Sequence, residues 1–122
     1  MLEMNSLSWK LPEDEQRRNI RNLQIESDDD IRKLILPYRR QECWENCALA
    51  LASLDDATIL RFLPELLEWF KDLNWPGVNI VHSRILKLPK EEVHSVLANV
   101  LLKASIEKDE EWIENLHTAF DE

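Results

Sequence analysis

A single glycine, Gly77, in a chain of 122 residues is the feature that most limits what this sequence can fold into. Tight β-hairpin turns depend on glycine, and so do the loops that bring backbone N–H groups close to a phosphate or expose a nucleophilic serine. The chain also has one Tyr and few Thr residues, which are types that strands favour. The sequence therefore predicts an all-α fold and excludes P-loops, dinucleotide-binding turns and nucleophile elbows.

The glycine ends a segment with clear helical periodicity, from Leu63 to Gly77. Pro64 suits the first helical position, where its missing N–H has no partner in any case. The run from Asn74 to Gly77 contains Pro76 and is expected to stop the helix and turn the chain. Four apolar residues at i, i+3, i+4 and i+7 predict one continuous helical stripe between these signals; they are Leu66, Trp69, Phe70 and Leu73.

Comparable patterns predict seven or eight short helices in total. Residues 42–54 are apolar on nearly all sides, which predicts a central, buried helix. Residues 12–122 are expected to form a single all-helical domain, with residues 1–11 as an N-terminal tail or cap. The predicted core contains the apolar residues that fall on helical stripes: Trp44, Cys47, Leu51, Leu66, Trp69, Phe70, Val96, Leu97, Val100 and Trp112.

The prolines recur at a nearly constant interval. Four of the five follow a leucine, at Pro12, Pro37, Pro64 and Pro89, and their spacings are 25, 27 and 25 residues. If each Leu-Pro pair opens a helix, each block that follows has room for two helices. This pattern predicts a compact, HEAT-like stack of short helical hairpins, that is, an irregular α-solenoid. The alternative is that the prolines mark helix starts in an ordinary helical bundle.

The net charge of −9 is concentrated after residue 40. Residues 1–40 contain eight acids and eight bases, whereas residues 41–122 contain 16 acids and seven bases. An acidic surface repels nucleic acids and anionic membranes and attracts basic proteins. The alternative is that the acids only keep the protein soluble.

Candidate partner-binding residues follow from this charge distribution. The acids that lie on polar helix faces or at helix starts after residue 40 are expected to meet a basic partner. Trp75, in the corner before Pro76, either packs in the core or anchors a partner, and the core interpretation is favoured. The acidic candidates are Asp55, Asp56, Glu65, Glu68, Asp72, Glu110, Glu111 and Glu114.

The sequence contains no pattern typical of catalysis or of metal binding. The three histidines are His82, His94 and His117, whose spacing does not match a zinc site. Cys43 and Cys47 stand one helical turn apart, as a redox pair or half a metal site would, but an apolar context favours buried, reduced and unliganded thiols. We therefore expect neither enzymatic activity nor a cofactor.

Two further patterns bear on capping and on location. The run Asp28 to Asp30 follows Ser27 and is read as a helix N-cap; a calcium loop needs acids at alternate positions and a glycine.

The N-terminus lacks the basic start and apolar stretch of a signal peptide, and no stretch approaches membrane-spanning length. A cytoplasmic location is expected.

The segment around the corner also resembles a known family. The run from Leu63 to Trp69, followed by Asp72 to Pro76, resembles the bacterial domain of unknown function 5071. The likeness continues more weakly through residues 86–92 and 109–112, so it covers mainly residues 60–112. The resemblance implies a small all-helical protein with HEAT-like packing and a bacterial source. It supplies no catalytic residue.

Two classes of function remain. The first is a non-enzymatic module that binds a basic protein, most concretely an immunity protein that neutralises a basic bacterial toxin. The alternative is an uncharacterised helical scaffold, or an acidic mimic of a nucleic acid, without catalytic activity. The sequence does not indicate the oligomeric state.

Overall fold

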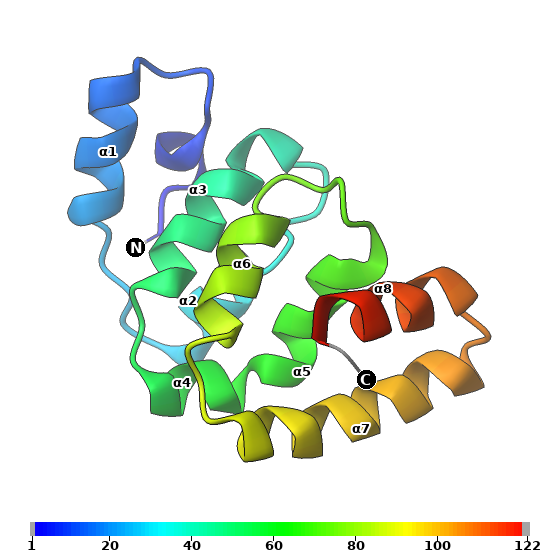
Figure 1. Cartoon of the computed structure of the whole chain (residues 1–122). Helices are drawn as coiled ribbons and strands as arrows, with labels where there is room; N and C mark the ends of the chain where they lie inside the picture. The colour runs from blue at the N-terminus through cyan, green and yellow to red at the C-terminus, as the bar shows by residue number, and fades with distance from the viewer. Residues whose placement is uncertain (1, 121–122) are drawn as a thin grey trace.

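The computed structural model describes residues 2–120, and every regular element in that range is helical (Figure 1). The all-α prediction is confirmed. Eight α-helices and two short 3₁₀ helices follow one another along the chain. They are η1 (Met4–Leu7), α1 (Glu13–Arg21), α2 (Asp28–Leu34), α3 (Gln41–Ala52), α4 (Asp56–Arg61), α5 (Leu63–Leu66), η2 (Leu67–Lys71), α6 (Val78–Ile85), α7 (Lys90–Ile106) and α8 (Glu110–Phe120).

Helix starts follow the capping signals of the sequence. The Ser27 hydroxyl accepts a hydrogen bond from the Asp30 N–H at 3.2 Å, and the Asp30 carboxylate accepts one from the Glu26 N–H at 2.9 Å. These two bonds satisfy N–H groups at the start of α2 that would otherwise lack partners. Capping is thus the structural role of this acidic run, to which Asp28 adds an ion pair with Arg61 at 3.0 Å.

The Leu-Pro pairs open helices in three of four cases. Pro12 and Pro89 are the N-caps of α1 and α7, and Pro64 lies in the first turn of α5. Pro37 does not open a helix, because α3 begins only at Gln41. The loop between α2 and α3 contains two non-glycine residues of positive φ and turns the chain before the helix can start.

Helix α3 is the centre of the molecule, as its composition predicts. It contacts η1, α1, α2 and α6, and most of its residues are buried. One exception is Leu49, which is 42% exposed on the outer face. In Figure 1, α1 lies on one side of α3, and the α7–α8 pair lies on the opposite side of the molecule.

The predicted continuous helix between Pro64 and Leu73 is wrong. An α-helical turn ends at Leu66, and η2 continues as a 3₁₀ helix to Lys71. A 3₁₀ helix has three residues per turn, so its side chains superpose at i and i+3 rather than on the i, i+3, i+4, i+7 stripe. Leu67 is therefore fully buried, whereas Leu73, which lies beyond η2, is 39% exposed.

The predicted core residues are buried with the exception of Val96, which is partly buried against the core. Three tryptophans in this core each donate their indole N–H to a backbone carbonyl. Trp44 bonds to the carbonyl of Pro37 at 2.8 Å, Trp69 to that of Pro76 at 2.7 Å, and Trp112 to that of Leu67 at 3.0 Å. Each bond satisfies a polar group that burial would otherwise leave unpaired.

The N-terminal segment packs against α1 and α3. Leu7 is fully buried, and the Trp9 N–H donates to the carbonyl of Glu42 at 2.8 Å. The buried amide of Asn46 donates to the carbonyl of Leu7 at 2.9 Å and to the side-chain oxygen of Gln16 at 2.8 Å. This network fixes the first residues of the described chain onto the central helix.

The two cysteines are free and buried on α3, as predicted. Burial raises the pKa of both thiols, that of Cys47 to about 12. Because the thiolate is the reactive form, we expect both to react slowly with a disulfide reagent at neutral pH and both to react fully after denaturation. Thiol titration with and without urea tests this. Fast reaction of either thiol in the native protein, or zinc bound in stoichiometric amount, would contradict it.

Among residues 2–120, no helix combines the length and the apolar character needed to cross a lipid bilayer.

Candidate partner-binding surface

Helix α8 lies directly against η2, and three side-chain hydrogen bonds hold the two elements together. The Asn115 amide donates to the carbonyls of Phe70 at 2.9 Å and Lys71 at 3.4 Å. The Trp112 indole bonds to the carbonyl of Leu67. Glu111 precedes Asn115 by one helical turn, so the two share the flank of α8 that faces η2. Acids of η2 and α8, 38 or more residues apart in the sequence when Asp72 after η2 is included, therefore lie on elements that pack together.

We call this surface, made of Glu68, Asp72, Glu110, Glu111 and Glu114, the α8–η2 acidic face. Its three α8 carboxylates are exposed. Across η2 and α8, four acids accompany one lysine, Lys71. Lys71 pairs with Glu68 at 3.3 Å and lies 4.6 Å from the ring centre of Trp112. Its ammonium group thus offsets Glu68, and a second lysine, Lys103 of α7, lies 6.0 Å from the same ring.

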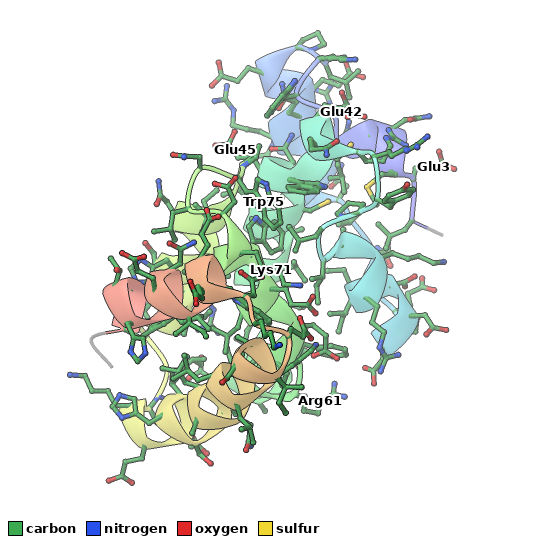
Figure 2. All side chains as sticks on the ribbon, turned by 90° about the vertical axis from the view of Figure 1, so that its right-hand side faces the viewer. Glu3, Glu42, Glu45, Arg61, Lys71 and Trp75 are labelled. Carbon is green, nitrogen blue, oxygen red and sulfur yellow. The ribbon has the colours of Figure 1, made fainter. Side chains whose placement is uncertain are left out.

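Asp72 and Trp75 form the corner at one end of this face. The Asp72 carboxylate accepts the Asn74 N–H at 2.8 Å, which shapes the turn. Trp75 is partly buried, and its ring meets that of Trp44 edge to face with centroids 5.2 Å apart. Figure 2 shows Trp75 between Glu45 and Lys71 on one side of the molecule. One part of this side chain packs on the core, and the rest is available to a partner.

Glu65 is the acidic candidate with a buried carboxylate oxygen. It lines a groove of about 340 Å³ between α2 and α5, together with Glu68 and Arg32. Its Oε2 atom is buried and has no hydrogen-bond partner among the described residues. Of the three acids expected to share a face, Glu65 and Glu68 line this groove together, and Asp72 follows η2 in the corner.

Asp55 and Asp56 have structural partners. The Asp55 carboxylate caps α4 by accepting the Thr58 N–H at 2.8 Å. Asp56 pairs at 2.7 Å with Arg84, whose side chain is 12% exposed. The same guanidinium donates to the carbonyls of Ala52 and Leu54 at the end of α3, at 3.1 and 2.8 Å. Asp55 thus stabilises the start of α4, Asp56 links α4 to α6 through Arg84, and replacing either acid would affect stability as well as any binding.

Several carboxylates have lowered pKa values, which predicts acid-sensitive stability. The pKa of Asp28 lies below its usual value because Arg61 hydrogen-bonds to it, that of Glu42 because of Arg40, and that of Asp55 because of Thr58. A carboxyl whose pKa is lower in the folded state stabilises the fold above its unfolded-state pKa, and this contribution is lost as the pH falls through the folded value.

We therefore expect the urea midpoint to be steady near neutral pH and to fall below about pH 4. Equilibrium unfolding at a series of pH values measures this. Asp28→Asn should show a smaller fall than the wild type, because the substituted side chain no longer titrates. A midpoint that stays constant or rises on acidification would contradict the assignment.

The described residues include no group of three or more His, Cys, Asp or Glu side chains that could hold a metal ion. His82 packs against Phe70 and Phe120 with ring centroids 5.7 and 5.3 Å away. One of its ring nitrogens, Nε2, lies 2.8 Å from the carbonyl of Ala119. These contacts assign His82 a structural role between α6 and α8.

The charge and helix patterns of the sequence did not predict one surface, which surrounds Tyr38. Tyr38 is 83% exposed beside several basic side chains of the loop between α2 and α3. The available signal was the basic run of Arg39 and Arg40 directly after the only tyrosine. The net charge of residues 1–40 does not reveal this basic run, because the eight acids of that segment balance its eight bases.

Comparison with known proteins identifies the family. The model of the family described as "Domain of unknown function (DUF5071)" matches residues 40–122, which is more than half of the chain and includes α3 to α8. No curated protein and no solved structure matches this chain. The match confirms the resemblance carried by residues 63–76 and extends it back to the start of the central helix. The chain belongs to the DUF5071 family.

Proposed function

We propose that this protein is a non-enzymatic binding module whose α8–η2 acidic face docks on a basic protein. The observation that carries the proposal is the packing of α8, with its exposed Glu110, Glu111 and Glu114, on η2, which contains Glu68 and precedes Asp72. Charge complementarity of this kind steers association and excludes acidic competitors. Trp75 at the edge of the face supplies an aromatic contact of the type found in binding hot spots.

The most concrete form of this function is an immunity protein that neutralises a basic bacterial toxin in the cytoplasm. An acidic inhibitor can cover the cationic substrate cleft of a nuclease, because that cleft already attracts negative charge. The net charge of −9 and the small helical fold support this form of the proposal.

We also propose that the helices form an irregular, HEAT-like α-solenoid. The Leu-Pro spacing divides them into four groups: α1–α2, α3–α4, α5–η2–α6 and α7–α8. Apart from those of η1, the more extensive contacts join elements of the same group or of neighbouring groups. Contacts limited to neighbours are the mark of a solenoid, and a solenoid offers extended surfaces for a protein partner.

The test of the function is to express the product of each gene adjacent to this one, alone and together with this protein. The proposal predicts that one product is basic, arrests growth alone, and is neutralised in a stoichiometric complex. Reversal of Glu110 and Glu111 to Lys should weaken the protection. The matched control is reversal of Glu91 and Glu92, which are also exposed acids in the first turn of a helix.

Protection by both charge-reversal variants equal to that by the wild type would overturn the acidic face as the docking surface. If no neighbouring product is toxic or bound, the scaffold alternative replaces the inhibitor.

A further inference from the structure

A second surface, separate from the acidic face, carries the opposite charge. It is a groove of about 450 Å³ between the N-terminal segment, α2 and the loop that follows α2. In Figure 2 the segment that carries Glu3 and helix α2 lie on the same side of the molecule. We call it the Tyr38 groove; its lining residues are Leu2, Met4, Arg32, Lys33, Ile35, Leu36, Pro37, Tyr38 and Arg40.

The lining combines an apolar floor with a cationic rim. The apolar part consists of the aliphatic side chains and the proline, and the charged part consists only of Arg32, Lys33 and Arg40. Arg40 is held by Glu42 at 2.8 Å and by the side-chain oxygen of Asn5 at 2.7 Å. Arg32 pairs with Asp29 at 3.3 Å. Lys33 forms no ion pair with any described residue, so positive charge remains on this rim.

Tyr38 stands out of the surface at the end of the groove. At 83% it is the most exposed large apolar or aromatic side chain among the described residues. The guanidinium carbon of Arg39 lies 5.2 Å from its ring centre, and Arg39 has no ion pair among the described residues either. An exposed Tyr beside Arg is the composition typical of binding hot spots.

The backbone holds this arrangement at a cost. Leu36 has a φ of 47° and Arg39 a φ of 56°, both in the left-handed region that non-glycine residues rarely adopt. The Trp44 indole bonds to the carbonyl of Pro37 and fixes the loop between them. Residues kept in sparsely populated conformations gather at binding sites, where the strain is part of the function. Here the strained loop presents Tyr38 and Arg39 to solvent, beside Lys33 of α2.

We propose that the Tyr38 groove binds an acidic peptide segment of a protein, with carboxylates on Lys33 and Arg39 and an apolar side chain on the floor. A cationic rim complements acidic side chains, and the aliphatic floor fits an apolar residue between them. A nucleic acid would leave that aliphatic floor unused, whereas a peptide can place an apolar side chain on it. This proposal does not depend on the function of the acidic face.

The test uses a synthetic, end-capped peptide in which one Phe stands between pairs of Glu residues. Binding to the full chain is measured by fluorescence anisotropy and mapped by NMR. We expect saturable binding that shifts the methyl signals of Met4, Ile35 and Leu36. Tyr38→Ala should weaken binding about tenfold or more, as for a hot-spot residue. Because the Tyr38 side chain is exposed, circular dichroism should show an unchanged fold.

Two double variants with the same change in net charge test whether the peptide binds at the groove or responds only to the total charge of the protein. Lys33→Glu with Arg39→Glu should weaken the peptide about tenfold or more, whereas Arg18→Glu with Arg21→Glu, exposed bases on α1, should have a much smaller effect. Equal effects of the two double variants, shifts outside the groove, or no saturable binding would overturn the proposal. So would tighter binding of a short single-stranded DNA, of phosphatidylserine vesicles, or of the same peptide with Lys in place of Glu.

Discussion

Replacement of Trp69 by alanine is expected to lower the free energy of unfolding by about 3–5 kcal/mol. Trp69 is fully buried between α3 and the corner that follows η2, and its indole N–H donates to the carbonyl of Pro76 at 2.7 Å. Its ring lies edge to face with that of Trp44, with centroids 6.4 Å apart. Truncation would open a large cavity and leave a carbonyl without its donor. Urea denaturation followed by far-UV circular dichroism measures the loss.

The control for this substitution is Trp9→Ala. Trp9 is also a tryptophan but is 47% exposed, so its loss should cost much less. A loss below about 1 kcal/mol for Trp69→Ala would place that side chain outside the core and contradict the packing described for the corner.

The second large effect is expected for Gly77→Ala, with a loss of about 2–5 kcal/mol. The φ of Gly77 is +89°, which an L side chain rarely adopts. A Cβ at this position would lie 2.9 Å from the Cβ of Ala48, 3.0 Å from the carbonyl oxygen of Trp44 and 3.2 Å from the ring of Trp69. The chain's one glycine thus permits both the turn before α6 and the close approach of that turn to α3.

A double-mutant cycle with Ala48→Gly separates the two causes. Removing the Ala48 methyl relieves one of the three close contacts, so the double variant should be more stable than the sum of the single losses predicts. The strain at positive φ should remain in both backgrounds. Additive losses would show that the contact with Ala48 is not what requires glycine, and a Gly77→Ala protein as stable as the wild type would contradict the geometry of the corner.

Local patterns predict most of the fold, because short amphipathic helices carry their own capping and burial signals. Ser27 and Asp55 mark helix starts, and most of α3 is buried as its apolar composition predicts. The switch to a 3₁₀ helix at Leu67 is not a local signal. It depends on the packing of Leu67 and Phe70 under α8, which no window of the sequence contains.

The candidate site could be predicted only as a set of residue types. Periodicity places acids on polar faces but cannot say that α8 lies on η2, since hydrogen bonds between residues 45 positions apart hold them together. For the same reason the sequence could not separate Asp56, which pairs with Arg84 across 28 positions, from the freely exposed Glu110. The net charge of residues 1–40 also gives no sign of the Tyr38 groove, because acids elsewhere in that segment balance the positive charges of the groove.

The central claim is that the α8–η2 acidic face docks on a basic partner, and association rates test it most directly. Stopped-flow rates are measured against the basic product of the adjacent gene at several salt concentrations, for the wild type and the two charge-reversed variants. Reversal of Glu110 and Glu111 should slow association about tenfold or more at low salt and flatten its salt dependence, while reversal of Glu91 and Glu92 should change little. Rates that are indifferent to salt, or equal for the two variants, would contradict the claim.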